Sequence, residues 1–186
     1  KRFFEIIVGN GFDKEAVRIL TKKKNIRIIN ASNLNINNFY NVISNFNSIM
    51  IQSPDNKIFT KKNLKIVSKR KPNRKTINNL IFAFNVCRNV KSNAIVLTKN
   101  YTTVGIGSGQ PSRLDSCNIA IKKMNKFQNI NNNDELVAAS DAFFPFVDGI
   151  EKLVQCGVSA IIQPSGSIND KEIIKFADQT NTSLVF

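Results

Sequence analysis

Short runs of apolar residues alternate with segments of helical periodicity along most of the chain. Strands are predicted at 3–8, 26–29, 48–52, 64–68, 94–98, 103–107, 136–140, 159–163 and 183–186. Helices are predicted at 13–23, 73–87, 111–124, 147–157 and 169–177. The asparagine-rich stretches 32–47 and 129–133 show no clear period and are predicted to be loops. Strands separated by single helices indicate an α/β domain whose helices pack on a sheet.

The clearest helical signal begins after Pro72-Asn73. Its apolar residues fall on one helical face, at Ile77, Leu80, Ile81, Phe84 and Cys87. Farther along, the pair Lys99-Asn100 between two β-rich segments predicts a hairpin with a tight turn.

Composition narrows the possible chemistry. With 42% hydrophobic residues the chain can bury a core, yet no segment approaches the roughly 20 apolar residues of a membrane span. The absence of histidine excludes an imidazole base or a histidine metal ligand within these 186 residues. Cys87, Cys117 and Cys156 are far apart in the sequence, which argues against a zinc site and a disulfide framework and is typical of a reducing compartment.

The formal net charge of +14 comes from 27 lysines and arginines against 13 acidic residues. Such an excess often indicates nucleic-acid binding. Here the basic residues are dispersed and are not interleaved with aromatic residues that would stack on single-stranded bases. The accompanying excess of Asn and Ile is typical of a compositionally biased genome. A solvated basic surface and an electropositive pocket mouth both remain open, and no specific nucleic-acid partner is expected.

A glycine-rich loop joins a predicted strand to a predicted helix, with the sequence Gly105-Ile106-Gly107-Ser108-Gly109-Gln110-Pro111-Ser112-Arg113. The N–H groups of such a loop and a helix N-terminus suit an anion, and Arg113 would add a forked cation for a phosphate. The loop lacks the third glycine of G-x-G-x-x-G and the G-K-[ST] of a P-loop. Anion binding and a tight structural turn both remain open.

A second segment also joins a strand to a helix, where α/β folds place their ligands. It reads Ser140-Asp141-Ala142-Phe143-Phe144-Pro145-Phe146-Val147-Asp148-Gly149. A phenylalanine there would stack on a flat heteroaromatic ring while Asp148 accepts a hydrogen bond from a ring N–H. The alternative is a packed corner in which Asp148 is the acid of a helix N-terminus. A third loop, Gln163-Pro164-Ser165-Gly166-Ser167, is a weak signal alone.

Four segments of the chain occur in a specific order: VKSNAIV at 90–96, the loop at 105–113, SDAFFPF at 140–146 and QPSGS at 163–167. Together they closely resemble the transformylase region of the bifunctional AICAR transformylase/IMP cyclohydrolase (PurH) family of purine biosynthesis, over nearly the whole chain. The resemblance implies a three-layer α/β/α, cytidine-deaminase-like fold that the family carries in duplicate. This chain is expected to hold an incomplete copy, with roughly 1–75 ending the first subdomain and 76–186 forming most of the second.

The resemblance also implies an activity and its partners. Family members transfer a formyl group from 10-formyltetrahydrofolate to the amino group of AICAR, and the product closes to IMP in a cyclohydrolase domain. A cytoplasmic homodimer without membrane association is expected. Zinc is not expected, because the histidine and P-C-x-x-C ligands of true deaminases are missing. A monovalent cation such as K⁺ would lie near Ser92 and Asp141.

Position by position, the resemblance assigns substrate-binding roles. The AICAR-binding residues are expected to be Glu5, Asn93, Arg113 and Phe143. Arg113 would bind the phosphate, and Asn93 would orient the carboxamide and amine and assist catalysis. The folate-binding residues are expected to be Leu114, Pro145, Phe146, Asp148, Ser167 and Ile168.

The chain departs from the family in several respects. It contains neither the family's catalytic Lys-His pair nor its cyclohydrolase domain, and Val147 stands where the family often has arginine. Loss of positioned acid–base groups typically costs about 10² to 10⁴ in rate. The chain is therefore expected to be a fragment that binds weakly and does not turn over. The alternative interpretation is a non-catalytic α/β ligand-binding remnant of the same family.

Overall fold

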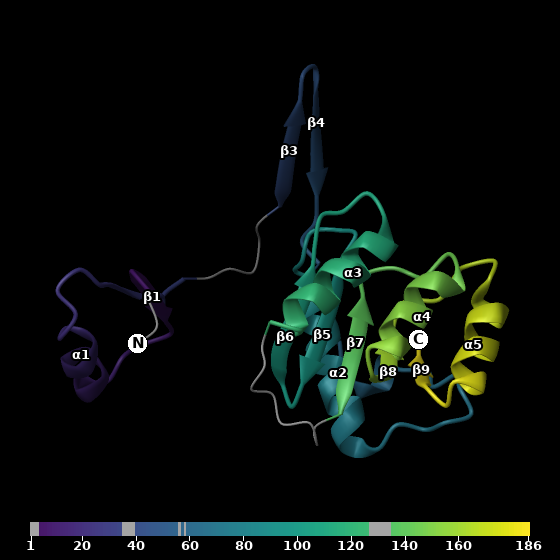
Figure 1. Ribbon diagram of the computed structural model, residues 1–186. Coiled ribbons are helices and arrows are strands. Elements are labelled where there is room, and N and C mark those ends of the chain that lie inside the picture. Colours follow the sequence, from purple (N-terminus) through teal and green to yellow (C-terminus); the bar gives the residue numbers. More distant parts are fainter. Residues whose placement is uncertain (1–3, 35–39, 56, 58, 127–134) are drawn as a thin grey trace. The chain divides into compact units, whose positions relative to one another are not determined.

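The computed structural model describes residues 4–34, 40–55, 57, 59–126 and 135–186. The chain divides into two compact units, Lys1–Lys57 and Ile58–Phe186 (Figure 1). Among the described residues, no helix combines the length and apolar character needed to cross a membrane.

The described residues of the first unit form two separate strand pairs and one helix. Its elements are β1 (Ile6–Gly9), α1 (Lys14–Leu20), β2 (Arg27–Asn30), β3 (Asn41–Asn45) and β4 (Ser48–Gln52). β1 and β2 are parallel and are connected by α1, whereas β3 and β4 form an antiparallel hairpin. None of the described residues of this unit is buried. Its strand pairs are therefore held by backbone hydrogen bonds without a hydrophobic core, which is a marginal arrangement in water.

The strand β3 contradicts the predicted loop at 32–47. In the hairpin, Val42 lies opposite Ile51 and Ile43 lies opposite Met50. These apolar pairs hold β3 against β4, and such cross-strand partners are not visible when each segment is read alone. The other predicted loop, 129–133, lies outside the described residues.

A five-stranded mixed sheet forms the centre of the second unit, in the order β6-β5-β7-β8-β9 (Figure 1). Its strands are β5 (Ile95–Lys99), β6 (Thr102–Gly107), β7 (Leu136–Ser140), β8 (Val158–Ile162) and β9 (Ser183–Val185). β5 is antiparallel to both β6 and β7, while β7, β8 and β9 are mutually parallel. The start of β5 therefore lies at the same edge of the sheet as the ends of β7 and β8.

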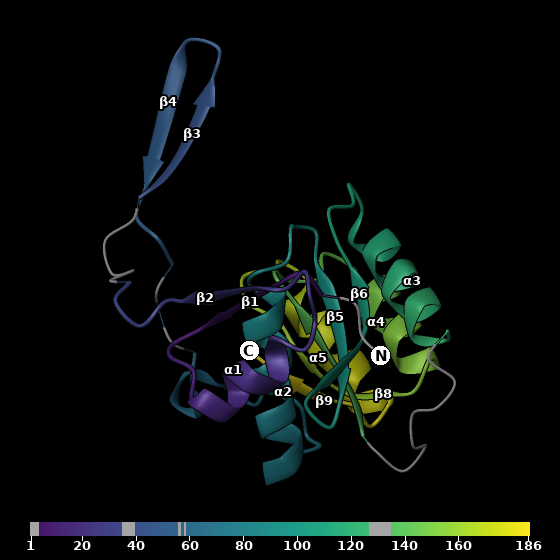
Figure 2. The ribbon, with the colours of Figure 1, turned by 90° about the vertical axis from the view of Figure 1, so that its left-hand side faces the viewer.

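Helices cover both faces of this sheet. They are α2 (Arg74–Cys87), α3 (Arg113–Met124), α4 (Val147–Gln155) and α5 (Asp170–Gln179). Leu80 of α2 packs in one cluster with Val96 and Val137, whereas the alternate strand residues Ile95 and Ala138 pack with α3, α4 and α5. Figure 2 shows α2 on the opposite side of the sheet from α3 and α4. The expected three-layer α/β/α architecture is confirmed.

The three cysteines pack in or against this hydrophobic interior and form no disulfide. Cys87, Cys117 and Cys156 are all free thiols. Burial raises the pKa of Cys87 and of Cys117 to about 12, so both are neutral at physiological pH. They act as small apolar side chains in the core.

The predicted strand at 64–68 is confirmed only in part. The short 3₁₀-helix η1 (Lys61–Asn63) precedes a segment whose one bridge pairs Ile66 with Val185 of β9. Leu64 and Ile66 pack against the cluster around α2. The segment also runs along β9: the Lys65 N–H donates to the Phe186 carbonyl at 2.6 Å and the Val67 N–H to the Leu184 carbonyl at 3.0 Å. Its apolar residues thus belong to an extended segment beside β9 that forms a single bridge among the described residues.

The predicted hairpin is confirmed, with its turn shifted by one residue. Lys99 pairs with Thr102, so the turn residues are Asn100 and Tyr101. Both have positive φ values, 45° and 57°, as a type I′ turn requires. Asparagine adopts this conformation more readily than most residues.

Candidate functional site

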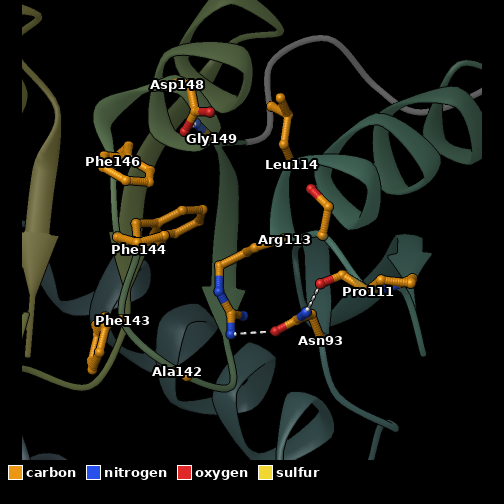
Figure 3. A pocket seen from close by; sticks show the side chains of 12 residues that line it. Asn93, Pro111, Arg113, Leu114, Ala142, Phe143, Phe144, Phe146, Asp148 and Gly149 are labelled. Carbon is orange, nitrogen blue, oxygen red and sulfur yellow. Dashed lines mark hydrogen bonds between the residues drawn. The ribbon is translucent and has the colours of Figure 1, made fainter.

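A pocket of about 530 Å³ lies where α3 and α4 begin (Figure 3). The segment before β5, the N-terminus of α3 and the loop between β7 and α4 form its wall. It is lined by Asn93, Pro111, Ser112, Arg113, Leu114, Ala142, Phe143, Phe144, Pro145, Phe146, Asp148 and Gly149. The antiparallel pairing of β5 with β7 places Ile95 opposite Ser140 and so brings Ala94 and Asp141, which are 47 residues apart, together at one edge.

Arg113 links the two sides of this wall. Its Nη1 donates to Ser140 Oγ at 2.9 Å and to Asp141 Oδ1 at 2.6 Å, and its Nη2 donates to Asn93 Oδ1 at 2.8 Å. The side chains of Arg113 and Asp141 are only 10% and 15% exposed. The ion pair between them is therefore largely shielded from water.

Asn93 is fixed in turn by the glycine-rich loop. Its Nδ2 donates to the carbonyl oxygens of Gln110 and Pro111 at 2.8 Å and 3.0 Å. The backbone carbonyl of Asn93 accepts a hydrogen bond from Ser116 Oγ at 2.7 Å. These contacts orient the amide so that its oxygen faces Arg113.

Asp141 is ionised at neutral pH. Burial alone would raise its pKa, but hydrogen bonds from the Ser92 side chain, the Ala94 N–H and Arg113, together with the Arg113 charge, hold the pKa below its ordinary value. Across the described residues, no group of three or more Cys, Asp and Glu side chains is arranged to hold a metal ion.

The glycines of the glycine-rich loop serve helix packing. A Cβ at Gly107 would lie 1.9 Å from the Ser116 carbonyl oxygen, and one at Gly105 would lie 2.1 Å from that of Ala120. Glycine at both positions therefore allows β6 to approach the α3 backbone closely. This supports the structural interpretation of the loop for these two glycines.

The three phenylalanines of the second segment divide between core and pocket. Phe144 is 1% exposed and packs in the core cluster beside α4, whereas Phe143 and Phe146 are exposed in the pocket wall. A Cβ at Gly149 would lie 2.6 Å from the Phe144 ring, so glycine makes room for that ring. The Phe144 N–H also donates to Oε1 of the buried Gln163, at 3.4 Å.

Asp148 has features of a helix-terminal acid and of a ligand-binding carboxylate. It lies in the first turn of α4, where an acid interacts favourably with the helix dipole, and its Oδ1 accepts the Gly149 N–H at 2.7 Å. Its side chain also lines the pocket. It is thus a helix-terminal acid whose carboxylate remains accessible to a ligand.

The pocket brings together seven of the ten residues to which substrate-binding roles were assigned: Asn93, Arg113, Leu114, Phe143, Pro145, Phe146 and Asp148. Ser167 and Ile168 are not among its lining residues, and Ile168 is fully exposed. Their loop is joined to the wall through Asn169 Nδ2, which donates to the Pro145 carbonyl at 2.6 Å. Glu5 belongs to the first unit, and its place in the site stays a prediction.

Sequence reasoning did not identify the partners that hold Arg113. The sequence predicts Ser140 as the last residue of a strand and Asp141 as a neighbour of a cation, and assigns neither a contact with Arg113. Both are polar residues at the end of a fully buried strand, which is the signal that would have indicated a role.

Comparison with known proteins agrees with the resemblance over the whole chain. The profile of the AICARFT/IMPCHase bienzyme family matches residues 1–123. The bifunctional purine biosynthesis protein PurH of Buchnera aphidicola subsp. Baizongia pistaciae is 45% identical over all of this chain and 35% of its own length. The PurH proteins of Fusobacterium nucleatum and Persephonella marina are 44% and 42% identical over 99% of the chain, again covering 35% of each relative. The chain spans about a third of the length of these relatives, and it belongs to the AICARFT/IMPCHase bienzyme family.

Proposed function

We propose that this chain is part of a folate-dependent formyltransferase of purine biosynthesis. Its reaction transfers the formyl group of 10-formyltetrahydrofolate to the amino group of AICAR, in a bifunctional enzyme that also carries IMP cyclohydrolase. Family membership supports this assignment, and the pocket supplies the observation that carries it: groups suited to a nucleotide and to a flat folate ring line the same cavity.

The two ends of the pocket suit different substrates. Arg113, Asn93 and Phe143 offer a cation, an amide and an aromatic face, which match the phosphate, carboxamide and imidazole ring of AICAR. Around the start of α4, Phe146 and Asp148 offer an aromatic wall and a carboxylate that accepts hydrogen bonds from the amino and N–H edge of a pterin. The formyl donor and the acceptor amine would then meet between Arg113 and Asp148, within one cavity of about 530 Å³.

The remaining assigned residues complete the proposal. Leu114 and Pro145 would be walls of the folate end, with Ser167 and Ile168 contributing from the adjoining loop and Glu5 contacting AICAR. A homodimer in the cytoplasm and a K⁺ ion near Ser92 and Asp141 belong to the same proposal. Because the chain has no histidine to move the proton during transfer, the 186 residues alone are expected not to turn over.

Separate titrations with AICAR and with an unreactive folate analogue test the proposal. Removing Arg113 with Arg113→Ala should weaken AICAR binding by about tenfold or more and leave the folate analogue almost unaffected, because a charge-assisted bidentate contact is lost. Asp148→Ala should show the opposite selectivity. Asp115→Asn, on an exposed acid of α3 outside the pocket lining, is the control for lost charge. Equal losses for both ligands in both variants, or no binding by the wild type, would contradict the proposal.

A further inference from the structure

Each acceptor that holds Arg113 is itself held in place. Ser140 Oγ donates to the Ala142 carbonyl at 2.6 Å, and Asp141 Oδ1 also accepts the Ala94 N–H at 2.9 Å. Neither side chain can rotate away from Arg113 without losing a second hydrogen bond. The protein therefore sets the direction of the guanidinium before any ligand arrives.

The hydrogen bonds of Arg113 leave one edge of the guanidinium open. Of its five N–H donors, two on Nη1 and one on Nη2 are used within the protein. For Nε–H and the second N–H of Nη2, the described part of the chain shows no hydrogen-bond acceptor. These two donors lie on the same edge of the planar group and point the same way, which is the geometry that binds two oxygens of a phosphate.

The open edge belongs to a residue of the pocket wall. In Figure 3 the guanidinium reaches Asn93 on one side, and Phe143 and Phe144 lie on its other side. Asp141 is absent from the lining residues and holds Arg113, which is one of them.

We propose that Asp141 is a positioning residue: by holding Nη1 of Arg113, it turns the Nε–Nη2 edge toward the pocket to receive the phosphate of AICAR side-on. The inference rests on the proposed function, which supplies the phosphate. Arg113 is already ion-paired with Asp141 at 2.6 Å, so phosphate recognition at this point depends on the direction of two donors more than on an uncompensated positive charge.

The direct test compares AICAR with the corresponding riboside, which lacks the phosphate, by NMR titration of the 186-residue chain. In the wild type, AICAR should bind more tightly than the riboside. Asp141→Asn should reduce this AICAR preference by about tenfold, the equivalent of one lost charge-assisted contact, and leave riboside affinity within about threefold. The matched control, Asp115→Asn, removes the same charge from an exposed position on α3 and should keep the preference.

The possible outcomes separate this inference from the proposed function. If folded Asp141→Asn keeps the wild-type preference for AICAR, the positioning role is overturned while AICAR recognition stands. If the wild type binds both compounds equally, the positioning role falls together with the phosphate role proposed for Arg113, and only the binding of the rest of AICAR stands. If the wild type binds neither compound, both proposals fail. Should Asp141→Asn lose its dispersed NMR spectrum, Asp141→Glu decides in its place. It keeps the charge but displaces the carboxylate that holds Nη1, and an unchanged preference there would overturn the inference.

Discussion

Arg113 and Asp141 show how one pair of residues connects fold stability with ligand recognition. The pair joins the first residue of α3 to the end of β7, and the bond from Arg113 to Asn93 adds the segment before β5, so Arg113 ties three segments together at the edge where the pocket opens. Removing one partner from a shielded pair leaves the other without compensation. Stability and binding are therefore expected to change together at this position.

The lowered pKa of Asp141 predicts how this contribution depends on pH. A carboxyl whose folded pKa is below its unfolded value stabilises the fold above the unfolded value, about 3.9, and the stabilisation disappears as the pH falls through the folded pKa. At pH 7 we expect Asp141→Asn to lower the free energy of unfolding by about 2 kcal/mol. Urea unfolding at pH 7 and near pH 3 should show that this gap shrinks in acid. A gap of the same size at both pH values would contradict the ion pair as its cause.

At the scale of elements, the close contact between β6 and α3 shapes the wall that carries Arg113. Gly107 leaves no room for a Cβ beside the α3 backbone. We expect Gly107→Ala to displace α3 and to cost about 3 kcal/mol, at the upper end of overpacking effects. Thr103→Ala on the exposed part of the same strand should cost less than about 1 kcal/mol. Thermal or urea unfolding of both variants measures the difference, and equal losses would show that the contact is not limiting.

The elements of the second unit could be predicted because each buries a periodic apolar face. The bounds of β7, Leu136–Ser140, agree with the prediction, and so do those of β4 in the first unit. The strand β3 could not be predicted, since pairing with β4 decides it. Such tertiary partners leave little trace in the local pattern.

The same limit applies to the pocket. The sequence indicated three loops with unusual chemistry, but it could not show that antiparallel pairing of β5 with β7 brings Ala94 beside Asp141. It also could not show that Phe144 belongs to the core while Phe143 faces the pocket. Whether each phenylalanine is buried depends on which side of the loop between β7 and α4 packs against the sheet.

The two units of the whole molecule differ in how they are stabilised. Every residue of the two hydrophobic clusters lies in the second unit, and the described residues of the first unit include none that is buried. We expect residues 58–186 alone to unfold cooperatively, with a midpoint close to that of the whole chain. Residues 1–57 alone should show no cooperative transition. Calorimetry on the two separate pieces tests this, and a disordered 58–186 would contradict it.

A crystal structure of the chain with AICAR and an unreactive 10-formyltetrahydrofolate analogue would show whether one cavity receives both substrates. We expect both ligands to occupy the pocket between α3 and α4. Two phosphate oxygens should lie about 3 Å from Nε and Nη2 of Arg113, with the pterin edge against Asp148. Density for AICAR at a different surface, with the Arg113 edge still open, would contradict the account.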